Sequence, residues 1–288
     1  MEKYLDIVEQ ELLKRERWPV TSHWASKLSR MAKCPRCGGE GKYLNPSALA
    51  MGEADVEICE DCVGGRVLQG ECMRALFWHW IGVKPSDETE AGAALKMAIG
   101  RSVHEMMEDA LGKVVAAVPE HRLEYKPDSL HYPIVARGDS FVLVPGESQV
   151  DIVEIKSVAD SQMRYLQKDH EVRDDWFTQG CVEAALWMRE FPHLPVRNLH
   201  FLIIGRGNAN RYEAVRPATP ETVEEVLAEC VERCAELEGW LLQAANDTGD
   251  SESALPPPEY KNLGAKGEWS HWKCDRYCQW RTLCKERG

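Results

Sequence analysis

The chain has 288 residues, of which 44% are hydrophobic, and it contains ten Trp and eleven Cys. This length allows one large domain with an insertion or two domains, and the apolar content is sufficient for a folded core. The 47 acidic residues outnumber the 35 Lys and Arg, giving a net charge of −12, which argues against a general basic coat for nucleic acid. A local DNA groove or bound cations remain compatible with this charge.

No apolar run approaches the ~20 residues that cross a bilayer, and the charged start "MEKYLDIVEQELLKRERW" has no signal-peptide core. We therefore expect a cytoplasmic protein with no membrane partner. In such a protein the cysteines are expected to bind metals rather than to form disulfides.

The first predicted element is an amphipathic helix over residues 1–17, followed by a Gly- and Cys-rich stretch at 34–70 with little hydrophobic periodicity. Helices are predicted from Cys72, in "ECMRALFWHWIGV", and over 91–116. Residues 121–158 have the composition of strands separated by turns.

Further along the chain, "RDDWFTQGCVEAALWMREF" predicts a helix, "VRNLHFLIIGRG" a short buried strand, and "RYEAVRP" its partner. Residues 219–245 form a long predicted helix, and a Ser- and Pro-rich loop leads into a Trp- and Cys-rich tail. This order of helices and strands predicts an α/β or α+β main domain.

Charged residues interrupt an apolar strand in "VDIVEIKSVAD", residues 150–160. Side chains alternate along a strand, so Glu154 and Lys156 stand where the apolar row should continue. Asp139 precedes Glu154 by fifteen residues, an interval that fits a hairpin bringing the two carboxylates together. The competing interpretation is a surface Glu–Lys pair on an edge strand, which contributes little.

Two such carboxylates suit Mg²⁺ or Mn²⁺, which would polarise a phosphodiester and lower the pKa of a bound water. Lys156 would orient or deprotonate that water, or stabilise the developing negative charge. His104 is a third candidate ligand, on the helical stripe of "GRSVHEMMEDAL", with Gly100 one turn earlier allowing another segment to approach. The alternative interpretation is that His104 is a histidine at the edge of the core and not a metal ligand.

Together, G-x3-H on a helix, D-x14-E-x-K and Gln179 in "WFTQGCVEAALW" resemble the RecB-like branch of the PD-(D/E)XK nuclease superfamily. The resemblance implies a restriction-endonuclease-like core, in which helices flank a central mixed sheet. It implies Lys156 as the catalytic lysine and these ligands of Mg²⁺ or Mn²⁺: His104, Asp139, Glu154 and the Ile155 carbonyl.

Gln179 matches the glutamine of the family's Q-x3-Y motif, which places it in the catalytic set. Glu183 stands at the tyrosine position, and this departure leaves the second half of the motif without an assigned role. The alternative for Gln179 is a solvated position on the helix.

Two groups of four cysteines have metal-ligand spacing. The first group, Cys34, Cys37, Cys59 and Cys62, forms C-x2-C-x21-C-x2-C, a pattern typical of structural zinc. Its "CPRCGGEG" form resembles the zinc knuckles of DnaJ-type chaperones and zinc ribbons. We predict a zinc-ribbon-like insertion at 34–67, either purely structural or in contact with DNA or a partner.

The second group lies mainly in the tail, where "WKCDRYCQWRTLCKERG" supplies Cys274, Cys278 and Cys284, with Cys72 as the best fourth member. A C-x-R-x-L-F-W helix followed by three C-terminal cysteines resembles the iron–sulfur RecB-like nucleases, which include CRISPR-associated exonucleases and the nuclease domain of AddB-type helicase–nucleases. The resemblance implies a [4Fe–4S] cluster that joins the two ends of this domain.

Two alternatives to this assignment remain. The C-x3-C-x5-C spacing is one residue longer at its first gap than the usual form, so zinc on the same thiolates is one alternative. The other is a register that uses Cys34 as the first cluster ligand and breaks the zinc quartet. The remaining thiols are expected in the core: Cys181, Cys230 and Cys234.

The predicted organisation is an N-terminal helical segment at 1–33, the zinc insertion at 34–67, and a nuclease domain at 68–288. The predicted function is metal-dependent DNA hydrolysis by an exonuclease preferring single-stranded ends, in recombination, repair or phage DNA metabolism of a bacterial or phage-infected cell. Expected partners are single-stranded or duplex DNA ends and a helicase or recombination protein. The alternatives are a catalytically silent DNA-binding or assembly module and an RNA nuclease.

Overall fold

The computed structural model describes these residues: 23–24, 30–33, 42–44, 56–58, 66–69, 72–87, 91–113, 115–169, 172–207, 210–246, 255–256 and 278–286. They fall into two compact units, the first within Met1–Leu28 and Thr89–Val231 and the second within Ser29–Glu88 and Glu232–Gly288. The predicted helix over 1–17 lies outside the described residues. Among the helices that are described, none is both long and apolar enough to span a bilayer.

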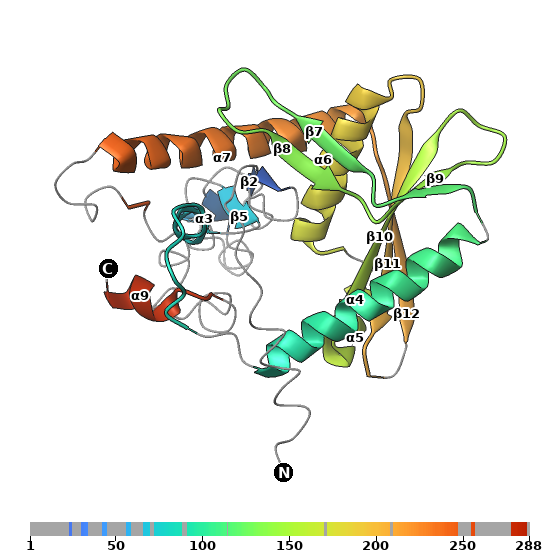
Figure 1. Ribbon diagram of the computed structural model, residues 1–288, viewed down its shortest axis with the longest axis horizontal. Coiled ribbons are helices and arrows are strands. Elements are labelled where there is room, and N and C mark those ends of the chain that lie inside the picture. Colours follow the sequence, from blue (N-terminus) through green and yellow to red (C-terminus); the bar gives the residue numbers. More distant parts are fainter. Residues whose placement is uncertain are drawn as a thin grey trace, which may run out of the picture. The chain divides into compact units, whose positions relative to one another are not determined.

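A five-stranded mixed sheet forms the centre of the first unit (Figure 1). Its strand order is β12 (Arg211–Pro217), β11 (Val196–Gly205), β10 (Val150–Val158), β9 (Ser140–Leu143) and β6 (Ala117–Pro119). β10 and β11 are parallel, whereas the other neighbours are antiparallel. The apolar runs of β10 and β11 fill the core because a strand with neighbours on both sides and helices on its faces is shielded from water. Their fully buried side chains include Ile152, Ile155, Phe201 and Ile203.

The β9–β10 hairpin brings the two predicted carboxylates to the same place. Its turn contains Gly146, whose φ of +79° favours glycine because this residue has no Cβ. Ser140 pairs with Val153, so the next residues along the ladder are Asp139 and Glu154. The predicted hairpin is therefore confirmed.

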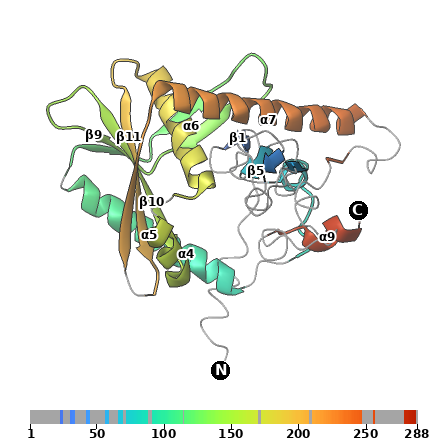
Figure 2. The same ribbon diagram turned by 180° about the vertical axis from the view of Figure 1, so that it is seen from behind.

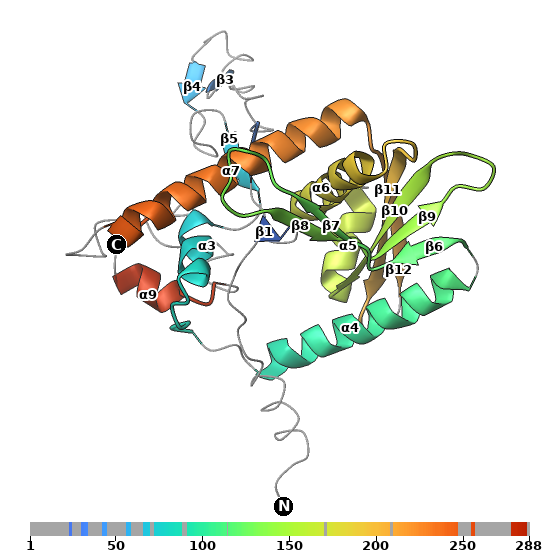
Figure 3. The same cartoon turned by 45° about the horizontal axis from the view of Figure 1, so that its top comes forward.

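Helices pack on both faces of this sheet (Figure 3). The helices of the first unit are α4 (Ala91–Gly112), α5 (Asp160–Asp169), α6 (Asp174–Glu190) and the part of α7 (Pro220–Asn246) that precedes Glu232. α4 lies close to β10, since a Cβ added to Gly100 would be 3.1 Å from Ser157 Oγ. α6 lies against β11, where a Cβ added to Gly180 would be 3.4 Å from the Phe201 ring.

A smaller sheet has the order β1 (His23–Trp24), β8 (Ile134–Arg137) and β7 (Arg122–Tyr125), and α6 packs against β7 and β8. α5 packs beside β11, as the view from behind shows (Figure 2). The predicted α/β class, a central mixed sheet flanked by helices, is confirmed.

The second unit has its own apolar core, built from α3 (Met73–Trp80), the end of α7 and α9 (Arg281–Glu286). Its buried members are Met73, Phe77, Trp78, Leu237 and Trp280. The Trp280 indole N–H donates a hydrogen bond to the Val83 carbonyl at 3.1 Å. Segments about two hundred residues apart in the sequence are thereby joined within this unit.

Two short antiparallel pairs complete the described part of the second unit. β2 (Arg30–Lys33) pairs with β5 (Arg66–Gln69), and β3 (Lys42–Leu44) pairs with β4 (Val56–Ile58). All four cysteines of the predicted zinc site lie outside the described residues: Cys34, Cys37, Cys59 and Cys62.

Candidate active site

The Glu154–Lys156 pair lies in the interior of the first unit. β10 is the middle strand of its sheet, and the Glu154 side chain is only 1% exposed. Lys156 Nζ donates to Glu154 Oε2 at 2.5 Å. The competing interpretation of a surface pair on an edge strand is therefore wrong.

Asp139 lies between β8 and β9, next to this pair. The backbone N–H of Ile155 donates to Asp139 Oδ2 at 2.6 Å, which fixes the carboxylate against the central strand. The ligand role predicted for the Ile155 carbonyl is a separate matter and stays a prediction.

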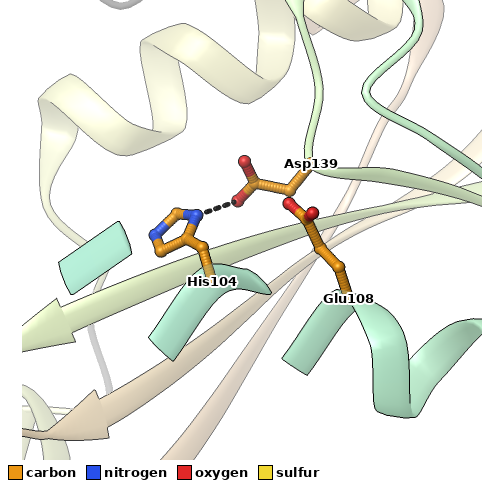
Figure 4. Close-up of side chains that lie close together, drawn as sticks. All are labelled: His104, Glu108 and Asp139. Carbon is orange, nitrogen blue, oxygen red and sulfur yellow. Dashed lines mark ion pairs between the residues drawn. The ribbon is translucent and has the colours of Figure 1, made fainter. Parts of the chain in front are cut away.

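His104 and Asp139 meet at the surface of α4, together with a residue that the sequence analysis missed. His104 Nδ1 lies 3.4 Å from Asp139 Oδ2, and Glu108 follows His104 by one helical turn (Figure 4). One ligand atom from each of His104, Glu108 and Asp139 lies within 4.8 Å of the other two. The sequence pattern that could have identified Glu108 is H-x3-E on a helix, because residues four apart lie on the same helical face.

This donor set suits a divalent cation. One imidazole nitrogen and two carboxylate oxygens are ligands that Mn²⁺ accepts, and Mg²⁺ is commonly held by one or two carboxylates with waters completing its shell. All three side chains are half-buried, so they combine reduced solvation with access from solvent. The residues therefore fit the predicted cation.

These groups influence one another's ionisation. Burial opposes the charged form of His104, but the hydrogen bond and negative charge of Asp139 outweigh burial and raise the pKa of this imidazole. Burial and the neighbouring Asp139 charge raise the pKa of Glu108. Burial also acts against ionisation of Asp139, yet His104 and Lys156 hold the pKa of Asp139 below its usual value. A cation among these oxygens would relieve the repulsion between the two carboxylates.

A second group of polar side chains surrounds Glu154 on the α6 side of the sheet. The Gln179 amide nitrogen donates to Glu154 Oε2 at 3.0 Å, and the Gln179 oxygen accepts from Lys156 Nζ at 3.2 Å. Gln179 therefore belongs to the buried network, and the alternative of a solvated helix position is wrong.

Glu183 is the fourth member of this group and is fully buried. Gln179 Nε2 donates to Glu183 Oε1 at 2.9 Å. Burial, followed by the charge of Glu154 and a hydrogen bond with it, raises the pKa of Glu183 well above its usual value. Among the residues that the structure describes, no N–H donor contacts Glu154 Oε1 or Glu183 Oε2, both of which are buried.

Lys156 remains an ammonium ion in this setting. Its burial alone would lower its pKa, but the charges of Glu154 and Asp139 more than compensate and raise the pKa of Lys156. A lysine held in its charged form is suited to stabilising negative charge rather than to removing a proton.

The cysteines predicted for the C-terminal cluster are partly described. Cys72 immediately precedes α3, while Cys278 and Cys284 pack against the apolar core of the second unit. The buried Arg74 guanidinium lies 3.7 Å from Cys284 Sγ and donates to it. Cys274 lies outside the described residues. The thiols expected in the core are buried: Cys181, Cys230 and Cys234.

Comparison with solved structures finds similar chains at low identity. SSO0001 shares 12% identity over 99% of this chain and 95% of its own, with a TM-score of 0.47. The alkaline exonuclease LHK-Exo from Laribacter hongkongensis shares 11% identity over 83% of this chain and 100% of its own, with a TM-score of 0.44. LHK-Exo in complex with dAMP shares 14% identity over 62% of this chain and 85% of its own, with a TM-score of 0.43.

Comparisons with protein-family models and with curated proteins give no match. The similarities to solved structures are too low to carry an argument about function.

Proposed function

We propose that the protein is a nuclease that hydrolyses phosphodiester bonds of DNA with Mg²⁺ or Mn²⁺. The observation that carries this proposal is the convergence of His104, Glu108 and Asp139 beside a buried Glu154–Lys156 pair. Cation ligands next to a fixed ammonium group suit hydrolysis of a phosphodiester, because a cation would polarise the phosphate and the ammonium group would stabilise the negative charge that develops on it.

The ligand set proposed for the cation extends from α4 to the central strand. His104, Glu108 and Asp139 provide its outer side, and Glu154 and the Ile155 carbonyl are proposed as further ligands. Glu154 Oε1 supports this role because it is a buried carboxylate oxygen to which no described N–H group donates. When bound, the cation would polarise a phosphoryl oxygen and lower the pKa of a bound water.

The protein side chains would then position and stabilise the reacting groups. The Ile155 N–H orients Asp139, and the Gln179 amide oxygen orients the Lys156 ammonium beside Glu154. Lys156 places a positive charge where the scissile phosphate gains negative charge in the transition state. Exonuclease action, a preference for single-stranded ends, and a helicase or recombination partner are parts of the same proposal and derive from the family resemblance.

A structural zinc ion at Cys34, Cys37, Cys59 and Cys62 is also part of the proposal. The register of the described strands supports it, because Lys33 pairs with Arg66 and Lys42 pairs with Ile58. The two segments that carry the cysteine pairs, 34–41 and 59–65, are thus bounded at both ends by paired strands. Such pairing would bring the two halves of a four-cysteine site together.

A [4Fe–4S] cluster at Cys72, Cys274, Cys278 and Cys284 is proposed for the second unit. Support comes from the shared core around α3, against which Cys278 and Cys284 pack and which Cys72 directly precedes. The Arg74 hydrogen bond to Cys284 would stabilise a thiolate ligand. Zinc at these thiolates remains the alternative.

The experiment that tests the nuclease proposal uses end-labelled single-stranded DNA, duplex DNA and RNA with anaerobically purified protein in Mg²⁺, Mn²⁺ or EDTA. We expect metal-dependent cleavage of DNA that Asp139→Asn and Lys156→Met abolish. Asp109→Asn is the matched control, because Asp109 is exposed on α4 and forms an ion pair with Lys113, which is not one of the proposed site residues. Binding of DNA without cleavage would favour the silent module, and preferential cleavage of RNA would change the substrate.

A further inference from the structure

Glu183 occupies a position that the nuclease proposal leaves without a role. It lies on α6 one helical turn after Gln179, so both side chains project from the same face of the helix. Its side chain is fully buried, and a buried carboxyl group is costly unless neighbouring groups stabilise it. The contacts of Glu183 therefore indicate what it does.

The first contact fixes the orientation of the Gln179 amide. The amide oxygen accepts from Lys156 at 3.2 Å, and the amide nitrogen donates to Glu154 at 3.0 Å and to Glu183 at 2.9 Å. If the amide were reversed, its oxygen would face two carboxyl groups and its nitrogen would face an ammonium group. Glu183 therefore supplies one of the two acceptors that select a single orientation.

Glu183 also lies close to the turn that carries Asp139. A Cβ added to Gly138 would lie 3.4 Å from Glu183 Oε2 and 2.8 Å from the Phe141 ring. The backbone just before Asp139 thus rests close to the carboxyl group of Glu183. The Glu183 side chain therefore belongs to the network around Glu154 and also lies close to the loop that carries Asp139.

We propose that Glu183 is a positioning residue, which holds the Gln179 amide and thereby sets the place of the Lys156 ammonium beside Glu154. It acts through these groups and does not itself contact substrate. The proposal rests on the proposed nuclease function, because Lys156 and Glu154 are the groups that it positions. It assigns the contact with Gln179, rather than ionisation of Glu183, as the important property.

Two substitutions separate this contact from ionisation of the side chain. Glu183→Gln keeps the length of the side chain and an oxygen that can accept from Gln179, but it cannot ionise. Glu183→Asp keeps an ionisable carboxyl group and shortens the side chain by one methylene, so that this group withdraws from Gln179. We expect Glu183→Gln to retain kcat within about threefold and Glu183→Asp to lower kcat by roughly tenfold or more. The KM for DNA should stay nearly unchanged in both, because misplacement of a catalytic group acts on the chemical step.

A double-mutant cycle tests whether Glu183 acts through Gln179. Gln179→Leu removes the intermediate group, so adding Glu183→Asp to it is expected to change kcat by less than about twofold. Full additivity of the two substitutions, or an active Glu183→Asp beside an inactive Glu183→Gln, would overturn the proposal.

A measurement without catalysis distinguishes failure of this proposal from failure of the nuclease function. In protein labelled with 15N-glutamine, the side-chain amide signal of Gln179 is the one that Gln179→Leu removes. We expect this signal to persist at its position in Glu183→Gln and to move toward the values of solvated amides in Glu183→Asp. An unmoved signal in Glu183→Asp contradicts the positioning role even if the protein cleaves nothing, whereas the expected shift in a protein that shows no cleavage contradicts only the nuclease proposal.

Discussion

Glu154 and Lys156 place opposite charges in the interior of the molecule, on the middle strand of the central sheet. Removing two charges from water costs several kcal/mol per ion, and well-packed apolar residues of similar size are often as stable or more so. The pair is therefore a poor choice for stability alone. A cation and phosphate site at the end of the strand gives a reason for placing these charges there.

The first prediction separates the contribution of this pair to stability from its contribution to activity. Lys156→Met leaves Glu154 buried without its ammonium partner, so we expect a loss of about 3 kcal/mol in the free energy of unfolding. The double substitution Glu154→Leu and Lys156→Met removes both charges and should recover most of that loss while remaining inactive. Urea denaturation of the three proteins gives the comparison. Equal stability of wild type and Lys156→Met would contradict the buried ion pair.

The second prediction concerns Glu108. If it is a cation ligand, Glu108→Gln should weaken Mn²⁺ binding by more than the ~10-fold loss that even supporting groups of metal sites cause. Isothermal titration calorimetry with Mn²⁺ measures this change. Asp109→Asn is the control on the same helix, with its carboxylate 68% exposed and paired with Lys113. An affinity in Glu108→Gln equal to that in the control would remove Glu108 from the ligand set.

At the level of secondary-structure elements, periodicity predicted the two longest described helices. The helix expected over 91–116 is found as Ala91–Gly112, and the helix expected over 219–245 as Pro220–Asn246. Apolar patterning carries this information because each element buries one face. The hairpin between the two carboxylates was predictable for a similar reason, since its strands are joined by a short turn containing Pro and Gly.

Two site residues were beyond such reasoning. Glu108 becomes a candidate ligand only because α4 docks with this face toward the Asp139 turn, and local sequence does not specify that docking. Glu183 stood out only as a departure from the Q-x3-Y motif, whereas its burial depends on how α6 packs against the sheet. Contacts between elements that are far apart in the chain set both roles.

The third prediction concerns the start of α9. Asp87 accepts the backbone N–H of Thr282 at 2.8 Å and pairs with Arg281, so it serves α9 as a capping residue does. Burial acts against its ionisation, but these hydrogen bonds and the Arg281 charge lower the pKa of Asp87 to about 2, from its ordinary value of 3.8. Its folded-state pKa is therefore below the unfolded one, and its contribution to stability is present above pH 3.8 and lost as the pH falls toward 2.

Asp87→Asn should accordingly cost about 1 kcal/mol at neutral pH. The difference in the free energy of unfolding between Asp87→Asn and wild type should shrink as the pH falls from 3.8 toward 2. Chemical denaturation at neutral and acidic pH tests this expectation, and a difference that grows on acidification would contradict the assigned role.

At the scale of the whole molecule, metal binding is the feature that the amino-acid composition first indicated. Within the second unit, hydrogen bonds join residues 72–87 to the Pro-rich loop and to the tail: Arg74 Nε donates to the Pro256 carbonyl at 2.6 Å, and the Leu283 N–H donates to Ser86 Oγ at 3.1 Å. A cluster ligated from both segments would reinforce this connection.

The fourth prediction follows from the proposed cluster. Protein purified without oxygen should contain about four iron and about one zinc per chain. Cys278→Ala and Cys284→Ala should lose the iron and its visible absorption while retaining zinc. Cys181→Ala is the control, because Cys181 is buried within α6 and lies outside both cysteine groups. Zinc in place of iron would support the alternative at these thiolates, and iron retained in both variants would refute the assignment.

The proposed metal site is tested most directly by locating Mn²⁺ in crystals of the protein through its anomalous scattering. We expect a strong peak bounded by His104, Glu108 and Asp139 on one side and by Glu154 on the other, and we expect it to disappear in Asp139→Asn. A peak at some other place in a protein that cleaves DNA, or a peak that survives Asp139→Asn unchanged, would contradict the proposed site.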